Sequence, residues 1–140
     1  MAELDWRNRG WSTEDADQAL RKLTDDERHA VRKLYLHYNK MTSVPQSITM
    51  LHNLEDLWLR NNKISELPSF LTQLTALKIL GCSFNRLGSV SREASMLVNL
   101  EQLYLHNNQL SSVPATLVNL TKLCRQDFPF FPLCFLIPIS

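Results

Sequence analysis

Four asparagines stand 23 residues apart along the chain, at Asn39, Asn62, Asn85 and Asn108, and each lies in the same apolar frame. The copies around them read VRKLYLHYNKM, LEDLWLRNNKI, LKILGCSFNRL and LEQLYLHNNQL, at residues 31–41, 54–64, 77–87 and 100–110. A fixed period of this length, with regularly spaced leucines and one Asn in each copy, is typical of a solenoid of stacked coils. The fold class is therefore constrained before any other feature is considered.

Each copy predicts a short strand followed by a bend. In Leu34-Tyr35-Leu36 the two leucines point to the core, and the residue between them points outward. The Asn comes three positions after the second leucine, where the chain turns and leaves backbone groups without partners. A carboxamide offers donors and an acceptor for such groups. We therefore predict a structural asparagine ladder formed by Asn39, Asn62, Asn85 and Asn108.

The second half of each copy predicts a short helical segment on the outer surface. Apolar residues recur there every three or four positions, as at Val44, Ile48 and Leu51. Three of the four segments have a proline, which suits the first helical position because no N–H is needed there. The third copy has Ser91 in place of this proline and Ala94 in place of a larger apolar residue. We expect the outer side of that copy to be the most loosely packed.

The pattern L-x-x-L-x-L-x-x-N-x-L-x-x-[LV]-P resembles the leucine-rich-repeat family, over residues 31 to about 123. The repeat length and the Val-Pro or Leu-Pro step are similar to the intracellular class typified by Ras-suppressor and Ras-scaffold proteins. The resemblance implies an α/β solenoid, a short horseshoe with parallel strands on its concave side and short helices on its convex side. It also implies that the concave face binds other proteins.

Three regions are predicted: an N-terminal helical capping segment at 1–30, four repeats at 31–125, and an apolar tail outside the repeats at 126–140. Ser12 begins one capped helix, and Thr24 with Glu27 forms the capping box of a second. Trp6 and Trp11 are expected to anchor the cap. A step of 23 residues back from Asn39 reaches Ala16, so we do not predict a further repeat in this segment.

The tail departs from the repeat, with Gln126 and Phe131 where the frame predicts Leu and Asn. It continues as FPFFPLCFLIPIS, without a charge and with three prolines, too short and too interrupted to span a bilayer. Three interpretations stay open: an apolar plug beneath the last repeat, an aberrant end of a truncated or variant product, and an anchor for a membrane or a partner.

Equivalent positions of neighbouring copies form rows across the concave face, with about 4.8 Å between strands. In the row between the frame leucines, Gly81 separates Trp58 from Tyr104, which predicts a notch about 10 Å wide between two aromatic walls. The next rows add imidazole, guanidinium and aromatic groups, and Trp, Tyr and Arg dominate protein interfaces. The predicted protein-binding residues are Tyr35, His37, Tyr38, Trp58, Arg60, Phe84, Tyr104 and His106.

Composition argues against several other functions. A net charge of +1 with interspersed charges is unlike a nucleic-acid-binding surface. Three cysteines without metal-ligand spacing, and a start without an apolar signal-like core, favour a cytoplasmic setting. His37 and His106 share a row but lie three strands apart, about 14 Å, too far for one metal ion. No catalytic or nucleotide-binding motif occurs, so we expect no enzyme, no cofactor, no metal site and no membrane insertion.

The leading interpretation is a protein-binding module that serves as an intracellular signalling or scaffolding adaptor through its concave face. The partner is expected to be a protein, and a link to small-GTPase pathways follows from the family resemblance alone. The alternative is a truncated or variant leucine-rich-repeat product without binding activity of its own.

Overall fold

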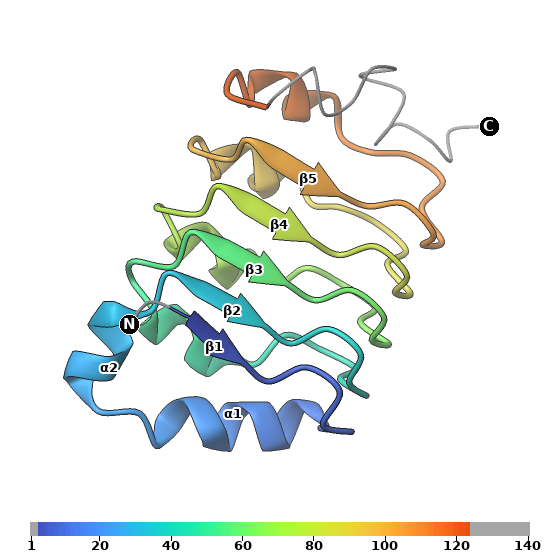
Figure 1. Cartoon of the computed structure of the whole chain (residues 1–140). Helices are drawn as coiled ribbons and strands as arrows, with labels where there is room; N and C mark the ends of the chain where they lie inside the picture. The colour runs from blue at the N-terminus through green and yellow to red at the C-terminus, as the bar shows by residue number, and fades with distance from the viewer. Residues whose placement is uncertain (1–2, 124–140) are drawn as a thin grey trace.

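Five strands form one parallel sheet in the computed structural model, which describes residues 3–123 (Figure 1). The strands are β1 (Glu3–Asp5), β2 (Lys33–Tyr35), β3 (Asp56–Trp58), β4 (Ile79–Gly81) and β5 (Gln102–Tyr104). Each strand pairs with the next in the chain, and the frame leucines Leu34, Leu57, Leu80 and Leu103 lie in register. The predicted solenoid of parallel strands is confirmed.

The return segments carry four short 3₁₀ helices. They are η1 (Gln46–Met50), η2 (Ser69–Gln73), η3 (Arg92–Met96) and η4 (Ala115–Asn119). Pro45 lies at the N-cap of η1 with an extended backbone, one position earlier than predicted, and its carbonyl accepts a hydrogen bond from Ile48 N at 3.1 Å. Ser91 replaces this proline at η3, where its hydroxyl accepts from Glu93 N at 3.2 Å. Either residue can therefore begin the helical turn.

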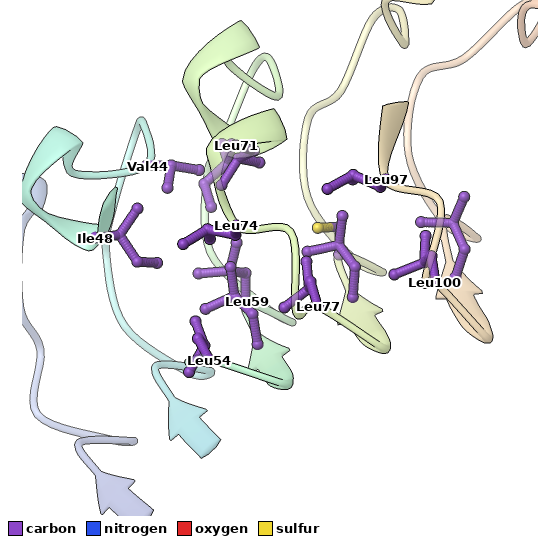
Figure 2. Packing of buried hydrophobic residues seen from close by; sticks show 14 of the residues in the cluster. Val44, Ile48, Leu54, Leu59, Leu71, Leu74, Leu77, Leu97 and Leu100 are labelled. Carbon is purple, nitrogen blue, oxygen red and sulfur yellow. The ribbon is translucent and has the colours of Figure 1, made fainter. Parts of the chain in front are cut away.

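The core lies between the strands and these helices. Side chains from both halves of each coil point toward one another, for example Leu54 and Leu59 on one side and Leu71 and Leu74 on the other (Figure 2). The frame leucines of the strands are 0–2% exposed. Because every coil contributes to the same apolar layer, each coil is stabilised mainly by its two neighbours.

Each frame asparagine links two consecutive coils through its side chain. Asn85 Oδ1 accepts a hydrogen bond from Ile64 N of the preceding coil at 3.1 Å. Its Nδ2 donates to Leu59 O of that coil at 2.9 Å and to Cys82 O of its own coil at 3.1 Å. Asn62 and Asn108 repeat this arrangement. These hydrogen bonds satisfy backbone groups that the bends leave without partners.

The N-terminal segment supplies a strand and a bend in addition to helices, a feature the sequence analysis missed. Leu4 of β1 pairs with Leu34 of β2. Asn39 Oδ1 accepts hydrogen bonds from Arg9 N and Trp11 N, both at 3.0 Å, so it treats this segment as the preceding coil. The offset from Leu4 to Leu34 is 30 residues, which is why a step of 23 residues fails to find this coil.

Two α-helices replace the short helical turn in this first coil and lengthen it. Helix α1 (Thr13–Arg21) begins at Ser12 and α2 (Asp25–Ala30) at Thr24, and each has a complete capping box. Ala16 and Leu20 of α1 are buried in the common core. Trp6 and Trp11 are partly buried against that core, with ring centroids 5.4 Å apart. The first coil thus covers the edge of β2 with strand and helix together.

The outer side of the third repeat contains an apolar cavity of about 20 Å³, between η2 and η3. Ala94 lines it at the position where η2 has Leu71 and η4 has Leu117. Leu97 and Leu120 form other parts of its wall. The looser packing expected for this copy is therefore found where the smaller side chain lies.

Within residues 3–123, no helix is both long and apolar enough to cross a bilayer. The plug, aberrant-end and anchor interpretations of the tail concern residues that lie outside the described part of the chain.

We predict that Asn85→Ala lowers the free energy of unfolding by at least about 2 kcal/mol, because each buried backbone group left unpaired costs roughly 1–3 kcal/mol. Urea titration followed by circular dichroism measures this change. Asn119→Ala is the matched control, since Asn119 is exposed on η4, and its effect should stay within about 0.5 kcal/mol. Equal effects of the two variants would contradict the structural role of the Asn85 side chain.

We predict that Ala94→Leu raises the free energy of unfolding by about 1 kcal/mol, because the added methylene groups fill the cavity and leave water. The midpoint of thermal unfolding is the measurement. Ala115→Leu, at an exposed position of η4, controls for helix propensity and should change little. A lower midpoint for Ala94→Leu would show that this layer is already fully packed.

Candidate functional site

The eight predicted binding residues come from β2 to β5 and from the bends that follow these strands. Tyr38 is 45% exposed and Phe84 36%, while Arg60 and His106 are also exposed. The other four residues, Tyr35, His37, Trp58 and Tyr104, are half-buried and lie outside the core cluster. The concave face therefore presents aromatic and basic groups to solvent, in three groups of mutual contacts.

Trp58 and Tyr104 form the first group and fill the space above Gly81. Their ring centroids lie 5.6 Å apart with an interplanar angle of 29°, a stacked arrangement. A Cβ atom added at Gly81 would lie only 2.7 Å from Trp58 Cζ3 and closer still to Cε3. The predicted open notch is therefore wrong, because stacking across a missing side chain removes apolar ring surface from water. The result is one continuous aromatic platform on three strands.

Arg60, Phe84 and His106 form the second group. The guanidinium carbon of Arg60 lies 4.8 Å from the centre of the Phe84 ring, a cation–π contact. Arg60 Nε donates a hydrogen bond to Asn61 Oδ1 at 3.0 Å. The Phe84 ring meets the His106 ring edge-on, with centroids 5.6 Å apart. These contacts hold a guanidinium group in one orientation on the rim of the concave face.

Tyr35, His37 and Tyr38 form the third group. The His37 ring lies 5.9 Å from the Tyr35 ring and 5.7 Å from the Tyr38 ring, measured between centroids. His37 Nδ1 is buried and has no hydrogen-bond partner within residues 3–123. Burial lowers the pKa of His37, Arg7 and Arg60 lower it further, and Asp5 opposes the shift. The imidazole is therefore biased toward its neutral form.

His106 has a similar electrostatic environment. Burial lowers its pKa, and the positive charge of Arg60 adds to the effect. Both imidazoles that flank Arg60 along the row thus favour the neutral state, in which each ring keeps one N–H donor and one acceptor.

A left-handed backbone precedes every frame asparagine. The residues with this conformation are Asn8, Tyr38, Asn61, Phe84 and Asn107, with φ between 56° and 58°. Asn adopts it readily, whereas a bulky aromatic residue there is an outlier that costs on the order of 1–2 kcal/mol. Tyr38 and Phe84 are therefore held at positions where Asn would fit with less strain.

Arg7 also belongs to this face, although sequence reasoning did not place it there. The pairing of β1 with β2 brings the residues after Asp5 beside those after Tyr35, and Trp6 N donates to Tyr35 O at 2.8 Å. Arg7 forms an ion pair with Asp5 at 3.0 Å. The signal that could have identified this coil is LDWRN, in which Leu4 and Trp6 take the places of two frame leucines.

The remaining candidates for chemistry are unreactive. Cys82 is buried in the core, and burial raises the pKa of its thiol to about 12, so it carries no nucleophilic thiolate at neutral pH. Among residues 3–123, no group of three or more His, Cys, Asp or Glu side chains is arranged to hold a metal ion.

The family model for leucine-rich repeats, which describes two copies at a time, matches residues 29–73, 52–94 and 75–131. Together these matches cover more than half of the chain. The chain belongs to the leucine-rich-repeat family. Domains of this family are in general modules that bind proteins. A search of curated proteins found no matching relative.

Solved structures of other leucine-rich-repeat proteins have the same fold. A leucine-rich-repeat protein of Leptospira interrogans superimposes with a TM-score of 0.70 at 29% identity, over 88% of this chain and 30% of that one. The functional domain of InlJ from Listeria monocytogenes, which includes a cysteine ladder, gives a TM-score of 0.67 at 23% identity, over 87% of this chain and 24% of that one. This leucine-rich-repeat chain thus spans less than a third of either protein.

We predict that Gly81→Ala displaces the Trp58 ring from Tyr104, because the new methyl group would occupy the same space. Near-ultraviolet circular dichroism and tryptophan fluorescence should change, while the free energy of unfolding falls by no more than about 1 kcal/mol since a side chain can move. Gly88→Ala is the control, because a Cβ there meets nothing within 4 Å. Unchanged spectra for Gly81→Ala would contradict the observed ring position.

Proposed function

We propose that this leucine-rich-repeat chain binds another protein through its concave face, as an intracellular signalling or scaffolding adaptor. The observation that carries the proposal is Phe84, an exposed aromatic residue in a left-handed bend where two other repeats have Asn. Strain of this kind at an exposed residue has no benefit for folding and is typical of functional positions. Arg60 stacked on the same ring adds a second residue type enriched at interface hot spots.

The finer parts of the proposal rest on weaker support. The cytoplasmic setting follows from three cysteines without a disulfide or metal pattern. The likeness to Ras-suppressor and Ras-scaffold proteins rests on the 23-residue repeat with its Val-Pro or Leu-Pro step. A partner in small-GTPase signalling follows from that likeness only.

The size of the face limits what it binds. Five strands are separated by four spacings of about 4.8 Å, so the sheet is about 19 Å wide. The strands are three residues long, and the face is therefore well below the roughly 800 Å² that each partner contributes to a standard interface. A narrow ligand, or a partner that also contacts the bends after the asparagines, fits this surface.

We predict that the double variant Trp58→Ala, Arg60→Ala remains folded but no longer recovers the proteins that the wild type retains from cytosol. Circular dichroism checks the fold, and quantitative pull-down measures recovery. The matched control is Arg92→Ala, Met96→Ala, which removes an arginine and an apolar residue from exposed positions of η3. If the wild type recovers nothing above background, the alternative of a variant product without binding activity is favoured instead.

A further inference from the structure

We propose that Arg60 is a carboxylate-binding anchor and that the occupant of the concave face is an acidic, extended segment of a partner protein. This inference rests on the proposed function and specifies the chemistry of the partner. Three independent observations support it: the charge balance around Arg60, the fixed geometry of its guanidinium group, and the width of the face.

The charge of Arg60 is not balanced by this chain. Other basic residues of the face have carboxylate partners: Arg7 with Asp5 at 3.0 Å, Lys33 with Asp56 at 3.9 Å, and Lys78 with Glu55 at 3.5 Å. Arg60 forms no ion pair within residues 3–123.

The rows that contain Arg60 hold no acidic residue. Its own row is Arg7, His37, Arg60, Ser83 and His106, and the next row is Asn8, Tyr38, Asn61, Phe84 and Asn107. Glu55 and Asp56 lie beyond the aromatic platform, where the lysines pair with them. The side of the face that follows the strands is therefore positive without a counter-charge, which is complementary to an acidic ligand.

The guanidinium group is already oriented for a carboxylate. Its Nε is held by Asn61 Oδ1, and its plane is held by the Phe84 ring. Neither terminal nitrogen, Nη1 or Nη2, has a hydrogen-bond partner in the described part of the chain. Two parallel N–H groups on a planar guanidinium match the two oxygens of a carboxylate. Because the side chain is fixed before binding, little rotamer entropy remains to be lost.

The neighbours of Arg60 favour the same ligand. His37 has a buried Nδ1 without a partner, and His106 touches the Phe84 ring. Neutral imidazoles supply N–H groups to an anion without repelling Arg60. The Trp58–Tyr104 platform, in the adjacent row, offers apolar surface to a residue next to the acidic one. A ligand with a carboxylate beside an apolar side chain fits both features.

The width of the sheet favours an extended segment. About 19 Å corresponds to about six residues at roughly 3.3 Å each. A peptide of this length that crosses the strands would contact the whole basic row.

The test is a selection of random twelve-residue peptides displayed on phage against the immobilised full chain. We expect enrichment of Asp and Glu beside apolar residues in the selected peptides. For a synthetic copy of the most enriched peptide, Arg60→Ala should raise Kd about tenfold, equivalent to about 1.4 kcal/mol, and Arg60→Lys should raise it less. Higher salt should weaken wild-type binding, because the contact is exposed. Arg92→Ala, on the convex side, should leave Kd unchanged.

Other outcomes overturn the inference in distinguishable ways. Peptides that require Trp58 but lack acidic residues and tolerate Arg60→Ala would overturn it while leaving the proposed function in place. Failure to enrich any peptide would overturn it, and the pull-down would then decide separately on protein binding. A wild-type dimer in sedimentation analysis that Arg60→Glu dissociates would replace the peptide with a second copy of this chain.

Discussion

The hydrogen bonds of the asparagine side chains hold the coils of this solenoid in step. Each carboxamide accepts from a backbone N–H of the preceding coil and donates to carbonyls of both coils, as Asn62 does with Met41 N and with Leu36 O and Leu59 O. Apolar packing alone is non-directional and would allow neighbouring coils to slide. The directional bonds fix the register, and because each coil contacts only its neighbours, one fixed step repeated along the chain sets the shape.

The same constraint determines what the concave face displays. For the carboxamide to reach the preceding coil, the residue before it takes a left-handed conformation, at Tyr38, Asn61, Phe84 and Asn107. The side chain at this position is directed away from the core and lies beside the strand of the next coil. Two repeats have Asn there, the residue that tolerates such a backbone best. The other two have aromatic residues, so stability was given up at the two positions that expose rings.

Much of this architecture could be predicted from the sequence because the period is fixed and the frame is short. The strands, their order and the outward direction of Trp58 and Arg60 follow from the spacing alone. The first coil could not be found in this way, because α1 and α2 lengthen it to a 30-residue offset that lies outside the period. The arrangement of the rings was also beyond reach. Whether Trp58 stands upright or lies over Gly81 depends on contacts between side chains three coils apart in the chain.

These causes converge on Arg60. Asn61, which holds its Nε, and Phe84, which holds its plane, occupy the left-handed positions of two adjacent coils. The distance between those positions is set by the sheet, and the sheet is held in register by the asparagines. A face this narrow has little area with which to bind, so affinity and specificity must depend on a few groups that are fixed before the partner arrives. Arg60 meets that requirement because the fold itself, rather than a flexible side chain, determines where its charge lies.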